Sequence, residues 1–336
     1  MTDMLKKLLV LRTPKIGPVK YRALLDEFGS DENIVEYLSP SEEFVDTVKR
    51  EMDKACDLGI EYISDTDSRY PTGLLNVKNH PIVISARGNI STLSKQCVSI
   101  VGTRHSTAAG MNFVSEIASE FAKHNFAVAS GMAMGTDTAA HLGALRTEGD
   151  SQTIAVLAGG VDYIWPLENE SLYYEILERG VAISEMPVGM MPNAQNFVQR
   201  NHWVAAISDT LIIGEADEKS GSMTTARFAI DYGKRLFAIP GHPSDSRSAG
   251  PNSLIKNGDA KMCLSVKDFF ADTKEIKNKK NQKQENEILD KLGTIPVSES
   301  VLANLVKKSV SEIKSDLIVL ELQGLVRKQD GGYVLN

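Results

Sequence analysis

The sequence predicts an α/β protein built on a doubly wound parallel sheet, with a small helical domain before the sheet and a winged-helix domain after it. Three observations support this prediction: helical spacing near the start, alternating apolar and amphipathic segments from about residue 96 to 270, and a helix-rich segment that ends in a hairpin. The predicted division is a helical domain at 1–65, a sheet domain at 66–272, a polar linker at 273–284 and a winged helix at 285–336.

The central segment alternates short apolar runs with amphipathic stretches, the pattern of strand–helix–strand units with right-handed crossovers. Several of the runs contain no polar residue, as expected of strands that helices cover on both faces. The six predicted strands are 97–101, 126–129, 153–157, 181–184, 210–214 and 236–239.

The N-terminal segment predicts short helices. Leucines recur at helical spacing over 5–11, and a second helical pattern covers 21–28. The turn between them contains Gly17, and two helices joined in this way form a helix-hairpin-helix-like unit whose backbone N–H groups suit a phosphate. A helical module that serves only packing is the alternative, because Lys20 and Arg22 make no basic cluster after the turn.

The C-terminal segment predicts a winged helix behind a polar linker. The linker carries five lysines and one acid over 274–283, which indicates a solvated connection, with loose attraction of phosphates as the alternative. Three short helical patterns then precede a hairpin whose turn is 330–332. Over 285–336 there are eight acids and six bases. This balance favours protein contact or structural capping over binding in a DNA groove.

Composition sets the limits on function. Hydrophobic residues make up 42% and charged residues 24% of the chain, which is typical of a globular protein and excludes a disordered tail or a disulfide scaffold. No apolar run approaches the roughly 18 residues of a membrane span. The apolar run after Lys6 and Lys7 is shorter than a signal-peptide core of roughly 7–15 residues. Cys56, Cys97 and Cys263 are scattered, so we expect a cytoplasmic protein.

The net charge of −7 places a further constraint on any nucleic-acid partner. A protein that holds DNA with a broad cationic surface is normally basic. Any polyanion must therefore bind here at a local site. The six histidines show no metal-ligand spacing, and no metal or cofactor is expected.

Small and hydroxylated residues follow the ends of several predicted strands, and these ends meet at one edge of a parallel sheet. Small residues allow the backbone to approach a ligand closely, and helix-start N–H groups suit an anionic oxygen. Arg104 supplies a guanidinium for phosphate. A phosphate site is therefore expected at this edge, with tight turns alone as the alternative. The segments concerned are 101–104, 130–137, 158–160, 214–216 with 220–225, and 240–241.

No convincing catalytic set is present, so we expect a protein that is not an enzyme. The sequence lacks GxGxxG after the first strand and lacks a P-loop, which disfavours NAD chemistry and P-loop ATP hydrolysis. Asp137 and His141 lie four residues apart on one helix face and could transfer protons, but a structural role fits them as well. The segment 195–203 suits single-stranded nucleic acid, through stacking of Phe197 or Trp203 on a base, although core packing explains Trp203 equally.

These residues, in this order, resemble the DNA-processing protein A family (DprA, also called Smf), from about residue 10 to 270. The motifs that carry the resemblance are Gly17-Pro18, Phe28-Gly29-Ser30, Tyr70-Pro71, Val101-Gly102-Thr103-Arg104, Ser130-Gly131-Met132-Ala133 with Gly135 and Asp137, Ala140-His141, Thr153–Leu157, Ser184-Glu185, Arg200-Asn201, Glu215-Ala216, Ser220-Gly221-Ser222, Pro240-Gly241, and Gly250 with Asn252, Leu254, Ile255 and Gly258.

The resemblance implies a SAM-like or helix-hairpin-helix domain, an extended Rossmann domain and a winged helix. It implies binding of single-stranded DNA, protection of incoming DNA in natural transformation, loading of the RecA recombinase in homologous recombination, and a homodimer through the Rossmann domain, without catalytic turnover. The alternative is a Rossmann-like hydrolase that cleaves nucleoside monophosphates. Such enzymes carry a different glycine-rich signature, since Gly159-Gly160 is followed here by Val161-Asp162.

The resemblance also suggests which residues hold the DNA backbone. Four positions depart from the family pattern: Met134 and His202 stand where the family commonly has arginine, Thr136 replaces isoleucine, and the fourth is Lys234. Lys234 replaces another arginine, with the charge retained. Fewer cations should weaken binding or make it more sensitive to salt, and His202 beside phosphate would add a pH dependence. The candidate DNA-binding residues are Gly102, Thr103, Arg104, Ser130, Gly131, Arg200, Asn201, Ser220, Gly221, Ser222, Thr225 and Lys234.

Overall fold

The computed structural model describes residues 1–148, 153–273, 288–293, 295–322 and 324–336. The chain forms two compact units, Met1–Val266 and Lys267–Asn336. Most of the segment predicted as a polar linker lies outside the described residues.

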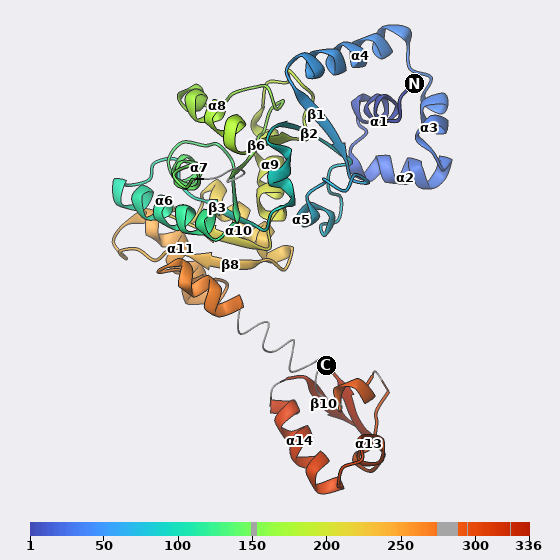
Figure 1. The fold of residues 1–336 in the computed structure, drawn as a ribbon, viewed down its shortest axis with the longest axis vertical. Helices are drawn as coiled ribbons and strands as arrows, with labels where there is room; N and C mark the ends of the chain where they lie inside the picture. Colours follow the sequence, from blue (N-terminus) through green and yellow to red (C-terminus); the bar gives the residue numbers. More distant parts are fainter. Residues whose placement is uncertain (149–152, 274–287, 294, 323) are drawn as a thin grey trace. The chain divides into compact units, whose positions relative to one another are not determined.

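The first unit is built on a sheet that has nine strands among the described residues (Figure 1). Its order is β1-β2-β6-β5-β4-β3-β7-β8-β9, and all neighbours from β6 to β9 are parallel. β1 and β2 are antiparallel to their neighbours. The strands are β1 Ile60–Ser64, β2 Val83–Gly88, β3 Cys97–Val101, β4 Ala127–Ser130, β5 Thr153–Val156, β6 Val181–Ser184, β7 Thr210–Ile213, β8 Arg235–Ala238 and β9 Lys261–Met262.

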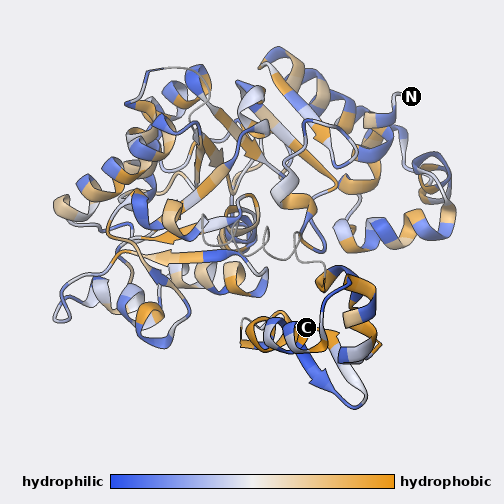
Figure 2. Ribbon diagram, turned by 60° about the horizontal axis from the view of Figure 1, so that its bottom comes forward, coloured by the Kyte–Doolittle hydropathy of each residue, from blue (hydrophilic) through white to orange (hydrophobic). Residues whose placement is uncertain are grey.

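Helices cover both faces of the sheet. Successive residues of a strand point to opposite sides, and in the central strands the residues on both sides are apolar and must be buried. Ile154 and Val156 of β5 belong to the same apolar cluster as Trp203 and Met223, on helices of one face. Ala155 of β5 belongs to a second cluster, with Tyr173 and Leu172 on the opposite face. Figure 2 shows hydrophobic residues concentrated in the central strands. The helices after the helical domain are α5 Thr72–Leu75, η1 Ile90–Ser94, α6 Ala108–Lys123, α7 Thr136–Leu145, η2 Leu167–Asn169, α8 Glu170–Arg179, α9 Ala194–Ala206, α10 Gly221–Asp231 and α11 Ser246–Asn257.

The predicted doubly wound parallel sheet is confirmed, and all six predicted strands form within one residue of their expected bounds. The prediction of helices up to residue 65 is wrong for β1, and β2 was not predicted. β1 is the edge strand and only part of it is buried, whereas β2 includes Ser85 and Arg87 among its residues, so neither shows the long apolar run of a central strand.

The helical domain packs four helices around its own core: α1 Asp3–Arg12, α2 Pro18–Phe28, α3 Asp31–Leu38 and α4 Glu42–Asp57. Gly17 precedes α2, with Pro18 at the first helical position, and Gly29 ends α2 at a φ of 77°. The core centres on Leu8, Tyr21 and Ile34, each at most 1% exposed.

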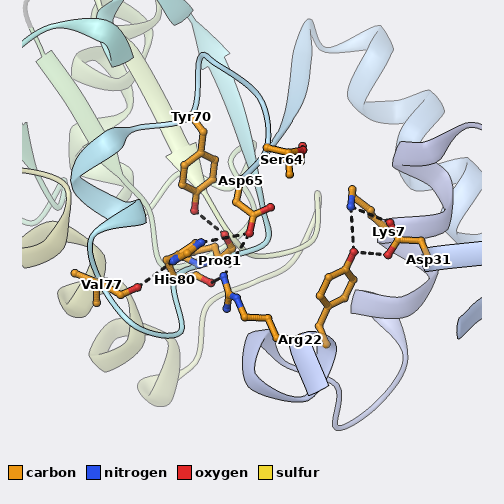
Figure 3. A network of polar contacts seen from close by, with 11 residues as sticks. Lys7, Arg22, Asp31, Ser64, Asp65, Tyr70, Val77, His80 and Pro81 are labelled. Atoms are coloured by element: carbon orange, nitrogen blue, oxygen red, sulfur yellow. Dashed lines mark hydrogen bonds and ion pairs between the residues drawn. The ribbon is translucent and has the colours of Figure 1, made fainter. Parts of the chain in front are cut away.

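Polar contacts fix this domain to the sheet (Figure 3). Arg22 of α2 donates to the Asp65 carboxylate at 3.4 Å and to the carbonyl of His80 at 3.1 Å. Glu51 of α4 accepts from the hydroxyl of Tyr62 on β1 at 2.9 Å and from the backbone N–H of Val188 at 3.2 Å. The helical domain and the sheet therefore form one unit.

The second unit has the expected winged-helix form. It contains η3 Leu289–Lys291, α13 Glu299–Val306, α14 Val310–Leu322, β10 Val326–Gln329 and β11 Gly332–Leu335. Its core includes Leu302, Ile313 and Leu317, and a bridge joins Val297 to Tyr333 of the hairpin. The exposed residues of α14 include Glu312 and Glu321.

Helices α6 and α7 approach closely at Gly143. A Cβ at this position would overlap the backbone of Ser115. Replacing an interior helical glycine with alanine normally gains about 1 kcal/mol of helix propensity. We expect Gly143→Ala to lower the free energy of unfolding by about 1–3 kcal/mol, because backbone atoms cannot move aside as a side chain can. Urea denaturation followed by circular dichroism measures the change.

Gly17→Ser is the matched control for this glycine. Nothing lies within 4 Å of an added Cβ at Gly17, and a serine hydroxyl can cap α2. This variant should unfold at the same urea concentration as the parent or at a higher one. A more stable Gly143→Ala variant would show that the two helices do not meet as described.

Candidate functional site

A cavity of about 390 Å³ opens at the carboxyl edge of the parallel strands, where the strand order reverses. β3 and β7 are neighbours there, and the chain runs from β3 to β4 on one side and from β7 to β8 on the other. Ligands of open α/β sheets bind at such a switch point. We refer to this space as the first cavity. It is lined by Val101, Gly102, Thr103, Arg104, His105, Ala133, Asp137, Arg200, Asn201, Val204, Ser220, Gly221, Ser222 and Thr225.

Backbone contacts hold the loops after β3, β4 and β7 together around the first cavity. The N–H of Thr103 donates to the carbonyl of Glu215 at 2.6 Å. The carbonyl of Thr103 accepts from the N–H of Thr136 at 3.2 Å. A glycine is required at position 102, because a Cβ there would overlap the Thr136 hydroxyl on one side and lie 2.8 Å from the Glu215 carbonyl.

Arg200 of α9 places a buried cation in the wall of the first cavity. The residue is only 6% exposed. Its guanidinium lies directly against Gly131, where any Cβ would overlap it. One terminal nitrogen donates to the carbonyl of Val156 at 3.3 Å, but the buried Nε has no hydrogen-bond partner among the described residues. A buried guanidinium with unused donor capacity favours an anion nearby.

Asp137 provides the neighbouring negative charge. Its carboxylate accepts from the N–H groups of Gly131 and Ala133 at 3.2 and 3.3 Å. Burial raises the pKa of Asp137 above its ordinary value, against the opposing effects of Arg200 and of these two amides. Burial also lowers the pKa of Arg200; the charge of Asp137 opposes this and Arg104 adds to it.

Arg104 is the exposed cation at the mouth of the first cavity. Its guanidinium carbon lies 5.1 Å from the ring centre of Trp165 and 5.8 Å from that of Phe197. The two rings are 4.6 Å apart and tilted by 59°. Among the described residues, no carboxylate lies within ion-pair distance of Arg104. Its charge therefore remains available to a ligand, and the aromatic pair restricts its position.

The N-terminus of α10 also faces the first cavity. Ser220 caps this helix, its hydroxyl accepting from the N–H of Met223 at 3.4 Å. First-turn N–H groups have no acceptor within the helix, so those after Ser220 suit an anion. The hydroxyl of Thr225 donates to the carbonyl of Gly221 at 3.2 Å and supports the turn.

The N-terminus of α6 is occupied by a side chain of the protein instead. The carboxylate of Glu215 accepts from the N–H of Thr107 at 2.7 Å and from its hydroxyl at 2.5 Å. A Cβ at Gly110 would lie 2.6 Å from this carboxylate. The positive end of α6 is thereby neutralised within the fold.

The structure brings together most of the predicted site residues but not all of them. Ser130 is buried and its hydroxyl donates to the carbonyl of Ile100 at 2.6 Å, while Gly131 lies beneath Arg200. Lys234 precedes β8 at the opposite edge of the sheet and lies 3.6 Å from Asp209. The predicted residues that line the cavity are Gly102, Thr103, Arg104, Arg200, Asn201, Ser220, Gly221, Ser222 and Thr225.

Two expectations for neighbouring side chains need correction. His202 lies on another side of α9 from the cavity, stacked on Phe228 at 3.5 Å and hydrogen-bonded to the hydroxyl of Tyr232 at 2.6 Å. Burial lowers its pKa, so the expected pH dependence beside phosphate is not supported. Trp203 is 7% exposed and belongs to the core, so of the two aromatics only Phe197 can meet a base.

Asp137 and His141 do not form a proton-transfer pair. The ring of His141 is fully buried and its Nδ1 lies 2.7 Å from the hydroxyl of Thr153. Burial, with a smaller effect of Arg200, lowers the pKa of His141 to about 3. Asp137 interacts with Arg200 instead. The surroundings of Asp137 and His141 therefore fit a structural role for each.

Sequence reasoning missed Trp165 as a neighbour of Arg104. It lies in the loop after β5, some sixty residues from Arg104 along the chain, and no local pattern connects the two. The helical spacing from His141 suggests proton transfer for Asp137, whereas its place beside Arg200 follows only from the fold. Over the described residues, no group of three or more His, Cys, Asp and Glu side chains is placed to hold a metal ion. No helix in the same part of the chain is long and apolar enough to cross a membrane.

The fold and the cavity define a class: α/β proteins with a cationic cavity at the switch point of the sheet, here joined to a winged helix. Comparison with known families gives a narrower result. The model of the DNA recombination-mediator protein A family matches residues 61–274, and that of the DprA winged helix domain matches 277–332. The chain therefore belongs to the DprA/Smf family.

Three relatives illustrate the similarity. The DNA processing protein DprA of Bacillus subtilis (strain 168) is 33% identical over 235 residues, covering 70% of this chain and 78% of the relative. The crystal structure of DprA from Streptococcus pneumoniae is 28% identical with a TM-score of 0.67, covering 81% of this chain and 98% of the other. A structure of DprA from Helicobacter pylori, described for its single-stranded DNA binding mode, is 31% identical with a TM-score of 0.58, covering 64% and 96%.

The charge balance in the cavity wall can be tested by its effect on stability. Arg200→Met should lower the free energy of unfolding by about 3–5 kcal/mol near neutral pH, because it leaves Asp137 buried without an opposite charge. The pKa of Asp137 is raised in the folded state, so the folded state binds its proton more tightly than the unfolded state does. Stability therefore falls as the pH rises from the pKa of Asp137 in the unfolded state through its higher pKa in the folded state. The destabilisation by Arg200→Met should accordingly be smaller at about pH 5 than at neutral pH.

Urea denaturation at the two pH values measures this effect. The control is Arg200→Met combined with Asp137→Asn, which removes both charges and should recover most of the stability at neutral pH. An equal loss at both pH values, with no recovery in the double variant, would show that the two charges do not interact.

Proposed function

We propose that this protein binds single-stranded DNA with its phosphates in the first cavity, and that it acts in recombination by protecting incoming DNA and loading RecA during natural transformation. The observation that carries the proposal is the buried guanidinium of Arg200, with an unused Nε, close to the exposed guanidinium of Arg104. The single-stranded DNA binding mode described for the Helicobacter pylori relative supports the same class of ligand.

The surroundings of Arg104 favour a single strand over a duplex. One phosphate would contact Arg104 and the next would approach Arg200 and the first turn of α10. The rings of Trp165 and Phe197 lie beside Arg104, where an unpaired base can stack on them. Trp165 is 37% exposed, so its face is accessible. Stacking accepts every base, and we expect weak sequence preference.

The acidic remainder of the chain limits where DNA can bind. With a net charge of −7, the protein attracts a polyanion only where its cations are concentrated. Met134 is 41% exposed and contributes no charge where the family commonly has arginine. A homodimer through the Rossmann domain would place two cavities on one strand, which raises the overall affinity without further cations.

The hydrolase alternative finds no support in the cavity. Cleavage of a nucleoside monophosphate would need a free carboxylate such as that of Glu215 after β7, but this carboxylate caps α6 through Thr107. It is not among the residues that line the first cavity. We propose binding without turnover.

Arg104→Ala should weaken binding of oligo-dT by about tenfold or more at moderate salt, because a charge-assisted hydrogen bond contributes about 1.5–3 kcal/mol. The slope of log affinity against log salt should also fall by about 0.7, the value expected for one phosphate contact on a single strand. Fluorescence anisotropy over a salt series measures both quantities.

Arg146→Ala is the matched control, because Arg146 is an exposed arginine after α7, at the opposite edge of the sheet. It removes the same charge and should leave binding unchanged. Equal dissociation constants for the parent and the Arg104→Ala variant would refute the role of the first cavity.

Loading of RecA can be tested separately from binding. The protein should shorten the lag before RecA hydrolyses ATP on single-stranded DNA coated with single-strand-binding protein. The Arg104→Ala variant should lose this effect at concentrations where it does not bind DNA, and regain part of it at low salt. A lag that the parent leaves unchanged at full DNA occupancy would contradict the loading function while leaving DNA binding intact.

A further inference from the structure

A second cavity, of about 610 Å³, lies between the helical domain and the sheet. Its walls come from the turn between α1 and α2, from residues 81–83, from residues 185–187 after β6, and from α9. All of these belong to the first unit, and none of the residues that line the second cavity has a role in the function proposed above.

Helix α9 separates the second cavity from the first. Gln195, Asn196 and Gln199 line the second cavity, whereas Arg200 and Asn201 line the first. An α-helix with its side chains is about 10–12 Å across, so the two cavities lie about one helix diameter apart. A few nucleotides of single strand can cover that span.

The frame around the second cavity is fixed by polar contacts. Arg12, in its wall, is bound to Glu51 by two hydrogen bonds of 2.9 and 2.7 Å. The hydroxyl of Tyr70 donates to the carbonyl of Pro81, another residue of the wall, at 2.6 Å (Figure 3). The cavity therefore exists without a rearrangement of the two domains.

The second cavity is lined mainly by uncharged residues, together with one acid and two cations, Arg12 and Lys15. Prolines and other apolar residues form much of its surface, among them Pro14, Pro81 and Pro187. The acid is Glu185, which follows β6. Burial raises the pKa of Glu185 above its ordinary value, against smaller opposing effects of Trp203, Gln199 and Arg12. Arg12 is already paired with Glu51, and among the described residues no cation forms an ion pair with Glu185. The opposing effects of Trp203 and Gln199 are those of side-chain hydrogen bonds to Glu185, and a carboxylate can accept about four, so it has capacity for a further donor.

We propose that the second cavity receives a base of the same DNA strand, and that Glu185 accepts a hydrogen bond from the exocyclic amine of that base. The inference rests on the function proposed above and adds base selection to it. Glutamate accepts from the N4 amine of cytosine, and adenine offers a comparable N6 amine, whereas thymine has none. Apolar walls suit the faces of the ring, and the amide of Gln199 can serve a second polar atom.

A base fits the second cavity better than a phosphate or a cationic peptide. A phosphate would meet the Glu185 carboxylate in a partly buried space, where like charges repel strongly. A basic peptide would suit the acid, but the nearby Lys15 and Arg12 carry the same charge as such a peptide. A neutral group that donates one hydrogen bond satisfies the acid without adding charge.

The test compares oligo-dC, oligo-dA and oligo-dT over a series of lengths by fluorescence anisotropy at neutral pH. For the parent protein, oligonucleotides too short to pass α9 should bind with similar affinity whatever their base. Longer oligo-dC and oligo-dA should bind about fivefold or more tightly than oligo-dT of equal length, since only they supply an amine. Glu185→Gln should remove this difference and leave short oligonucleotides and oligo-dT unaffected.

Two further variants make the result decisive. Glu116→Gln removes the same charge from an exposed position on α6 and should retain base selection. Gln199→Ala truncates a half-buried amide in the same cavity and should reduce the difference in affinity between long oligo-dC or oligo-dA and oligo-dT. Thermal unfolding shows whether Glu185→Gln is folded, and Gln199→Ala keeps the test valid where it is not. Loss of affinity for every length and base in Glu185→Gln, or equal binding of all long oligonucleotides by the parent, would overturn the inference.

Arg104→Ala separates this inference from the proposed function. If Arg104→Ala binds all oligonucleotides as the parent does, the first cavity is not the phosphate site, whatever Glu185→Gln shows. If Arg104→Ala weakens every oligonucleotide while Glu185→Gln changes none, the first cavity holds DNA and the second does not. If basic peptides compete with long oligo-dC in the parent but not in Glu185→Gln, the second cavity belongs to a protein partner and the inference fails.

Discussion

The site depends on one buried charge, the guanidinium of Arg200 beneath the carboxyl edge of the sheet. Only 6% of the residue is exposed, and its Nε finds no acceptor among the described residues. Its position requires Gly131, since any side chain at that position would displace it. The charge of Asp137 makes its burial tolerable without neutralising the cavity, because the backbone amides of Gly131 and Ala133 already share that carboxylate. The fold thus maintains a buried cation whose remaining hydrogen-bond donor can be satisfied by a ligand.

This arrangement explains how an acidic chain can hold a polyanion. The loops after β3 and β7 are joined through Thr103 and the carbonyl of Glu215, so the cations and the start of α10 keep fixed positions. The side chain of Glu215 meanwhile neutralises α6. Of the N-termini of α6 and α10 at this edge, that of α6 is therefore satisfied by the protein and that of α10 is left for a ligand. Attraction of a polyanion is therefore confined to the side of these loops that faces the first cavity.

The sequence predicted the parallel strands well, because burial on both faces imposes an apolar run that a single chain reveals. It also predicted most of the cavity, since glycines and hydroxyls at strand ends can meet only at one edge. It failed where position in space differs from position along the chain. Lys234 precedes a strand and so lies at the wrong edge, and Trp165 reaches Arg104 from a distant loop. The burial of Arg200 and the orientation of His202 depend on helix packing, which residue type alone does not determine.

The long helix of the winged-helix unit has a consequence for the kinetics of the whole protein. In DNA-binding winged helices and their relatives, the corresponding helix enters the major groove between two phosphate chains. Here α14 presents Glu312 and Glu321 to solvent, and Lys314 is engaged with Glu299 at 3.4 Å. This helix would be repelled from a groove. Under the proposed function, the rate at which a bound strand is released would then depend on its contacts with the sheet domain.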